Sequence, residues 1–125
     1  MRIAQIAQRA VDLDRAVTFY EDLLGSGVAA RFDPPGLAFF TVDGVRLLLD
    51  RAAPSALVYL TVASVRSKTE ELRRRGVTIN GEPHIIFRHE DGAIGPAGTE
   101  EWMSFIIDSE GNTVGLVSWE HAEPT

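Results

Sequence analysis

The sequence has no cysteine, no excess of positive charge and no long apolar run, and each absence excludes a class of function. Without cysteine, neither a disulfide nor a thiol nucleophile is available. The 18 acidic residues outnumber the 12 basic ones, and the formal charge of -6 disfavours binding to a phosphate backbone. No apolar stretch reaches the ~18 residues of a transmembrane helix, and no signal-peptide core follows Met1. We expect a cytoplasmic protein that binds neither nucleic acid nor membrane.

What the chain does contain is one pattern of elements, stated twice. Residues 3–50 predict a strand, a helix and a late hairpin, and residues 57–119 predict the same order. With 125 residues and 45% hydrophobic content, the chain is large enough to bury a hydrophobic core without stabilisation by disulfides or metal ions. We therefore expect a single domain over residues 1–125, with module one at about 1–52 and module two at about 55–120.

Each module begins with a strand and a capped helix. In module one a strand-like segment at 4–11 precedes Asp12, which is placed to cap a helix that ends before Gly25. The apolar residues of this helix fall at helical spacing: Leu13, Val17, Tyr20 and Leu24. In module two a strand at 57–62 precedes Ser64 as the cap, and a basic last turn suits the negative end of the helix dipole.

Each module also ends in a hairpin. Residues 37–42 and 45–50 flank the dipeptide Asp43-Gly44, a strong signal for a two-residue turn. Residues 102–107 and 113–119 flank a longer turn, Asp108-Ser109-Glu110-Gly111-Asn112.

Two segments resemble characteristic segments of a known family. Residues 11–20 read VDLDRAVTFY and residues 105–112 read FIIDSEGN. They resemble the usual first helix and last turn of the vicinal oxygen chelate superfamily, which includes glyoxalase I, bleomycin-resistance proteins and extradiol dioxygenases. The resemblance implies an α+β fold in which two βαβββ modules form a cupped mixed β-sheet, with helices outside and a ligand cavity inside. It also implies a homodimer.

The resemblance further implies where a metal would be bound. Metal-dependent members place four ligands on the first and last strands of their modules, and the matching positions here are Gln5, Leu48, Leu57 and Gly115. Only Gln5 has a side chain with a lone pair to give, and one neutral amide is a poor ligand for a catalytic divalent ion. We expect no metal and no cofactor.

Alternation along the strands assigns side chains to the inner face of the cup. The ligand-binding residues expected there are Gln5, Arg9, Phe39, Arg46, Leu48, Leu57, Tyr59, Trp102 and Gly115, with Trp119 on the last strand. Aromatic walls favour a planar ligand, and the two arginines favour one with an acidic group. The alternative is that these aromatic residues are core or dimer contacts.

Two functions remain open. The first is a small-molecule binding protein of the glyoxalase/bleomycin-resistance type that lacks the usual metal ligands and binds a planar or aromatic compound. The second is a glyoxalase-like lyase or isomerase, in which Gln5 works with His84 or Glu101 as an atypical metal site or proton relay. A weaker third is an interaction module whose cup is filled by its own side chains.

The polar, glycine-rich segment 88–101 is either a lid or a surface loop. We interpret the three histidines, His84, His89 and His121, as surface or loop residues.

Overall fold

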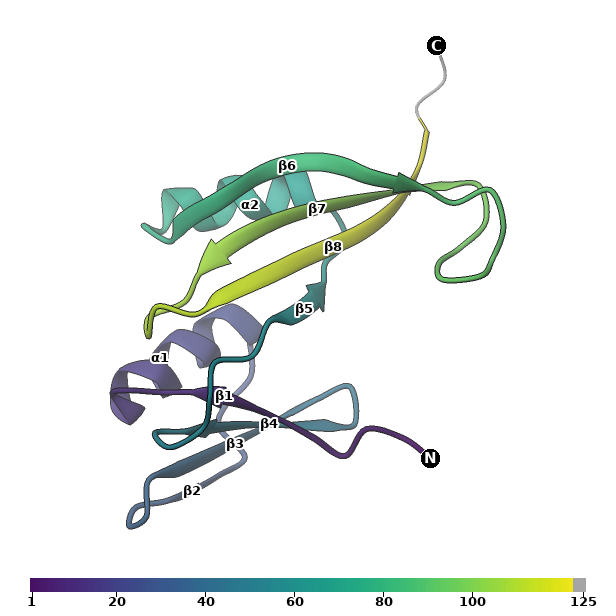
Figure 1. The fold of residues 1–125 in the computed structure, drawn as a ribbon. Coiled ribbons are helices and arrows are strands. Elements are labelled where there is room, and N and C mark those ends of the chain that lie inside the picture. The colour runs from purple at the N-terminus through teal and green to yellow at the C-terminus, as the bar shows by residue number, and fades with distance from the viewer. Residues whose placement is uncertain (123–125) are drawn as a thin grey trace. The chain divides into compact units, whose positions relative to one another are not determined.

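The computed structural model describes residues 1–122 and gives both halves of the chain the same order of elements (Figure 1). The elements are β1 (Gln5–Arg9), α1 (Leu13–Leu24), β2 (Ala30–Phe32), β3 (Leu37–Val42), β4 (Val45–Asp50), β5 (Val58–Thr61), α2 (Val65–Arg74), β6 (Thr78–Arg88), β7 (Thr99–Ile107) and β8 (Thr113–His121). The predicted α+β fold of two βαβββ modules is confirmed. In the described part of the chain, no helix is long and apolar enough to cross a membrane.

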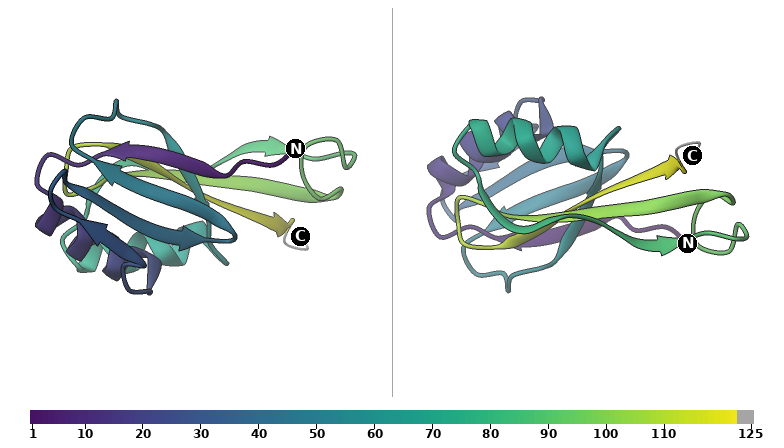
Figure 2. Two further views of the ribbon diagram at one scale, coloured as in Figure 1. Left: turned by 90° about the horizontal axis from the view of Figure 1, so that it is seen from below. Right: turned by 90° about the horizontal axis from the view of Figure 1, so that it is seen from above.

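The strands form two four-stranded mixed sheets with the same internal order. The first is β1-β4-β3-β2 and the second is β5-β8-β7-β6. In each sheet the first strand of the module pairs parallel with the last, and the other pairs are antiparallel. The left view of Figure 2 shows the strands of the first sheet side by side.

The chain divides into two compact units. Unit 1 comprises residues 1–56 and 108–112, and unit 2 comprises residues 57–107 and those from 113 on. The turn at 108–112 therefore belongs to unit 1, although the two strands that it joins belong to unit 2.

The core of unit 1 lies between α1 and its sheet. Asp12 caps the helix by accepting a hydrogen bond from Arg15 N, and Gly25 ends it in the left-handed conformation. Alternate residues of β3 and β4, among them Phe40 and Leu49, are fully buried against the helix. The predicted parity of this hairpin is confirmed, because Val42 pairs with Val45 across the tight turn.

In unit 2 α2 and its sheet bury hydroxyl groups beside apolar residues such as Leu72, Ile106 and Leu116. Ser64 caps the helix. The buried hydroxyls of Thr69 on α2 and Ser104 on β7 are hydrogen-bonded at 2.8 Å. The backbone N–H of Val65 donates to Ser118 Oγ on β8 at 3.1 Å. These polar contacts show that Ser104 and Ser118 point toward the helix.

A buried hydrogen-bonded cluster holds the 108–112 turn against the rest of unit 1. Tyr20 on α1 donates its hydroxyl to Asp108 Oδ2 at 2.7 Å. Asn112 Nδ2 donates to the same oxygen at 2.9 Å and to the backbone carbonyl of Arg9 at 2.7 Å. Burial, with the neighbouring Asp108 charge, raises the pKa of Tyr20, so the phenol stays neutral and donates.

A second set of contacts ties the same turn to the start of α1. Glu110 accepts from the backbone N–H of Asp12 at 2.6 Å and from Arg15 Nε at 2.8 Å. Burial alone would raise the pKa of Glu110, but these donors and Ser109 outweigh burial and hold that pKa below its usual range.

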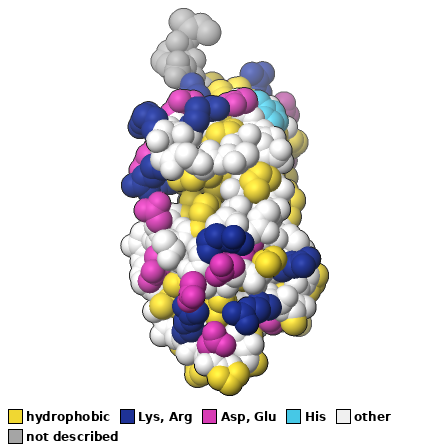
Figure 3. Space-filling model, turned by 90° about the vertical axis from the view of Figure 1, so that its left-hand side faces the viewer, with side chains coloured by type: hydrophobic (Ala, Val, Ile, Leu, Met, Phe, Trp, Pro, Cys, Tyr) yellow, Lys and Arg dark blue, Asp and Glu magenta, His cyan; other side chains and the backbone are white. Residues whose placement is uncertain are grey.

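On the face of the protein drawn in Figure 3, basic and acidic side chains are interspersed.

Together these contacts form the turn clasp, consisting of Asp12, Arg15, Tyr20, Asp108, Glu110 and Asn112. The clasp explains why the two segments that resemble the family occur together, because each supplies half of one hydrogen-bonded cluster.

Candidate functional site

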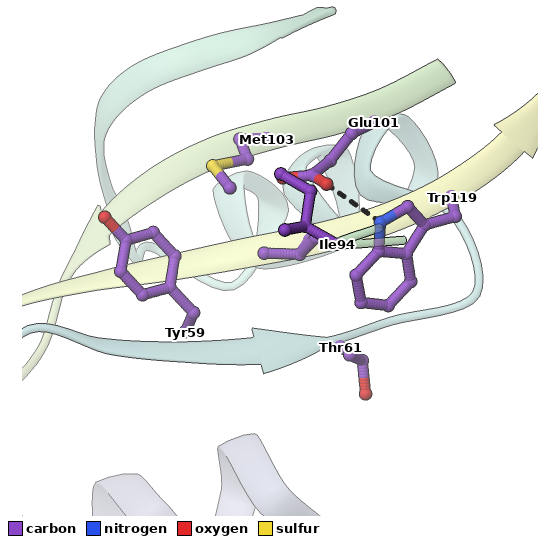
Figure 4. Close-up of a pocket in the computed structure, with 7 residues that line it drawn as sticks. Tyr59, Thr61, Ile94, Glu101, Met103 and Trp119 are labelled. Carbon is purple, nitrogen blue, oxygen red and sulfur yellow. Dashed lines mark hydrogen bonds between the residues drawn. The ribbon is translucent and has the colours of Figure 1, made fainter. Parts of the chain in front are cut away.

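A pocket of about 290 Å³ lies on the open face of the second sheet, the face that α2 does not cover. It is lined by Tyr59, Thr61, Ile94, Glu101, Met103, Val117 and Trp119, all of them in unit 2. Figure 4 shows Tyr59 and Trp119 at opposite ends of the lining, with Glu101 and Met103 between them. The pocket therefore has two aromatic ends and a single carboxylate.

Strand pairing explains why these residues share a face. Three rows of cross-strand partners cross the sheet: Tyr59, Gly115 and Phe105; Thr61, Val117 and Met103; Trp119 and Glu101. Partners in register point to the same side of a sheet. The odd-numbered residues of β7 and β8 therefore face the pocket, and the even-numbered ones face α2.

This register corrects the predicted face of Trp102. Trp102 pairs with Ser118, and its ring is covered by Arg66 of α2, with Cζ 4.3 Å from the ring centroid. The turn at 108–112 has five residues, so Ile107 opposes Thr113 and residues of equal parity lie opposite one another. The prediction had combined even-numbered residues of β7 with odd-numbered residues of β8, a pairing that would need a turn of even length.

The carboxylate of Glu101 is oriented by two nitrogen donors. Trp119 Nε1 donates to Glu101 Oε1 at 2.8 Å, and His89 Nε2 lies 2.8 Å from the same oxygen (Figure 4 draws the first of these). Only 13% of the Glu101 side chain is exposed. Within residues 1–122, no donor is found for the second oxygen, Oε2. One oxygen is therefore fixed, and the other is available to a molecule in the pocket.

His89 is buried beneath the loop that follows β6. The loop closes as a hairpin end, because His89 N donates to Thr99 O and Gly98 N donates to His89 O. A Cβ atom at Gly95 would lie 2.6 Å from His89 Cε1 and 2.9 Å from Trp119 Nε1. The loop backbone thus packs directly on the two donors, and the adjacent Ile94 reaches the pocket.

His89 lies in the loop after β6, one of the two expected positions, but it is not a surface residue, since 1% of its side chain is exposed. His84 is exposed, and its Nδ1 lies 2.9 Å from the carbonyl oxygen of Glu82. It pairs with Met103 and so lies on the pocket side of β6, a face that the sequence left unassigned.

The position expected to resemble a metal-ligand site in unit 2 is filled by an aromatic ring. A Cβ atom at Gly115 would lie 2.6 Å from Tyr59 Cδ1, so the tyrosine occupies the space of a larger side chain at this position. Leu57 precedes β5 and is half-exposed. Among residues 1–122, no three His, Cys, Asp or Glu side chains gather where an ion could be held. The side chains at these positions do not fit a divalent metal.

The remaining predicted residues lie on the open face of the first sheet. Gln5 pairs with Arg46, Ala7 with Leu48, and Phe39 also with Leu48. The guanidinium of Arg46 lies over the Phe39 ring, 5.7 Å from its centroid. Arg9 is exposed at the end of β1. The predicted site residues are thus distributed over both units, and the pocket in unit 2 contains Tyr59, Glu101 and Trp119 of the predicted set, with Gly115 behind the tyrosine.

Several residues that line the pocket or pack against its lining were not predicted. Met103 and Phe105 would have followed from counting the five residues of the turn. Ile94 and His89 are placed by the closure of a loop, and no local pattern in the sequence indicates it.

The fold and pocket define a two-module α+β protein in which Gln5 alone, of the four positions expected to bind a metal, has a side chain with a lone pair. Comparison with known proteins identifies its family: residues 2–116 match the model of the Glyoxalase/Bleomycin resistance protein/Dioxygenase superfamily, and the chain belongs to that superfamily. No curated protein matches the chain.

Solved structures of low sequence identity share the fold. A superfamily member from Sphaerobacter thermophilus DSM 20745 has a TM-score of 0.70 and 19% identity, with 94% of this chain and 96% of that chain covered. A glyoxalase/bleomycin resistance protein/dioxygenase from Nocardioides has a TM-score of 0.66 and 22% identity, covering 100% and 88%. Lactoylglutathione lyase from Agrobacterium tumefaciens has a TM-score of 0.64 and 21% identity, covering 93% and 92%.

Proposed function

We propose that the protein binds a small planar organic molecule in the unit 2 pocket and that binding requires no metal ion. The observation that carries this proposal is the pocket itself, in which two aromatic side chains flank one oriented carboxylate. Small-molecule sites are typically apolar, with a few placed polar groups that fix the orientation of the ligand.

The lining supports a planar ligand of modest size. Tyr59 is 49% exposed, and its ring is positioned edge-to-face against Phe105 at 6.1 Å. Trp119 is held by its bond to Glu101, which keeps the indole from rotating freely. A volume of about 290 Å³ lies near the lower limit for ligand pockets, which suits one or two fused rings.

A second candidate function is a lyase or isomerase that transfers a proton without metal. The observation that favours it is Glu101, which lines the pocket and keeps Oε2 without a partner among residues 1–122, as a general base requires. Formation of S-lactoylglutathione in the presence of EDTA, lost in Glu101→Gln, would support catalysis. Binding without turnover would support the first function.

The test of the first function is calorimetric titration of EDTA-treated protein with 2-naphthamidine, 2-naphthamide and 2-naphthoate. These probes share one planar ring system and differ in charge. Elemental analysis after incubation with zinc, nickel, manganese and iron(II) accompanies the titration. Saturable binding of at least one probe by metal-free protein is expected. Failure of all three to bind, or binding that needs a retained metal ion, would overturn the proposal.

A further inference from the structure

We infer that Glu101 determines specificity in the pocket by accepting a hydrogen bond from a positively charged nitrogen of the ligand. The pocket would then select planar amidines and protonated amines over neutral or anionic molecules of the same shape. This inference rests on the proposed binding function and adds the charge class of the ligand.

The first step is the direction of the carboxylate. Both recorded partners of Glu101 contact Oε1, namely Trp119 Nε1 and His89 Nε2. Gly95 packs on the donor side of the cluster, and a Cβ atom there would lie within 3 Å of both donors. Oε1 is thus occupied, whereas Oε2 has no partner among the described residues and is not one of the fully buried unpaired atoms, so it is accessible beside the pocket that Glu101 lines.

The second step is the cost of leaving this oxygen unpaired. The Glu101 side chain is largely enclosed, and its neighbours in the lining include apolar Met103 and Val117. A carboxylate oxygen that loses water to an apolar ligand is left without a partner, which is unfavourable. A ligand that brings an N–H donor replaces the lost water, and a charged donor does so most strongly.

The third step is the ligand charge that the two aromatic side chains at the ends of the pocket favour. The faces of tyrosine and tryptophan attract cations through the ring quadrupole. Tyr59 and Trp119 therefore favour the same sign of ligand charge as Glu101. The sequence had indicated an acidic ligand from Arg9 and Arg46, but both arginines belong to unit 1 and neither lines this pocket.

The experiment compares 2-naphthamidine, 2-naphthamide and 2-naphthoate on the wild-type protein and on Glu101→Gln. Glutamine keeps an oxygen for Trp119 and His89 but presents an amide N–H where Oε2 was. Glu100→Gln is the matched control, because it removes the same charge one residue earlier, on the opposite face of β7, where Glu100 pairs with Arg88. Melting temperatures of both variants verify that the fold is retained.

The expected result is that wild type binds the amidine about tenfold or more tightly than the amide, and the naphthoate least, as a charged hydrogen bond implies. Glu101→Gln should lose the preference for the amidine and gain affinity for the naphthoate, and Glu100→Gln should match wild type. Equal affinities for the three probes, or an equal loss in both variants, would overturn the inference while leaving the binding function intact. Absence of binding by every probe would overturn the binding function as well.

Discussion

Unit 1 and unit 2 have the same order of strands, but the residues buried between the helix and the sheet differ in polarity. In unit 1 a cluster of buried apolar residues fills the space between α1 and the sheet, and the turn clasp adds long-range hydrogen bonds from Asp108 and Glu110. In unit 2 the buried hydroxyls of Thr69, Ser104 and Ser118 lie between α2 and the sheet among buried apolar residues. One topology is therefore compatible with two kinds of helix interface.

The open faces of the two sheets differ as well. The face in unit 1 carries arginine, with Arg46 over Phe39. The face in unit 2 carries a carboxylate between Tyr59 and Trp119. The side chains on the paired strands differ, and in unit 2 the loop after β6 adds Ile94 to the lining of the pocket.

The largest expected effect concerns the clasp. Asp108→Ala removes the acceptor of Tyr20, of Asn112 and of two backbone N–H groups. Leaving several buried donors unpaired should lower the free energy of unfolding by about 3 kcal/mol or more. Urea unfolding followed by circular dichroism measures this change. A loss below about 1 kcal/mol would mean that water replaces the carboxylate at small cost.

The matched change in unit 2 should cost less. Ser104→Ala removes one partner of Thr69, whose hydroxyl still donates to the Val65 carbonyl at 2.6 Å. The expected loss is about 1 kcal/mol, measured by the same urea titration. If Ser104→Ala proves as damaging as Asp108→Ala, the contrast between the two interfaces fails.

Acid should weaken the clasp selectively. The pKa of Glu110 is lower in the folded protein than in the unfolded chain, so its stabilising contribution is complete above the unfolded value. That contribution disappears as the pH falls through the folded value. The difference in unfolding free energy between wild type and Glu110→Gln should therefore be largest near neutral pH and shrink below about pH 4. A difference independent of pH from 7 to 3 would contradict this assignment.

The smallest expected effect tests the contrast between the open faces. Arg46→Ala, in unit 1, should leave the affinity for 2-naphthamidine unchanged, because the lining of the pocket comes from unit 2 alone. Titration calorimetry measures it beside Glu101→Gln. A clear loss of affinity in Arg46→Ala would show that the first sheet contributes to the same site.

The sequence predicts those parts of the fold that depend on local signals. Asp12 and Ser64 cap their helices as expected, and the strands flanking Asp43-Gly44 have the predicted limits. The limits of β2 and β6 were not predicted, because both fall in stretches without clear alternation, and β6, expected only around residues 85–87, is interrupted by register shifts.

The site was harder to predict than the fold. Tyr59 and Trp119 follow from alternation on β5 and β8, but one miscounted turn placed Trp102 on the wrong face. The burial of His89 depends on the backbone of Gly95, a contact created by loop closure that no periodicity encodes.

The turn at 108–112 also affects the order of events during synthesis. A ribosome delivers residues 1–56 before the turn that completes unit 1. Until that turn arrives, the hydroxyl of Tyr20 and the backbone carbonyl of Arg9 lack their partners Asp108 and Asn112. Until then, these two groups can form hydrogen bonds only with water. The first half of the protein therefore reaches its final hydrogen bonding only after nearly all of the second half has been made.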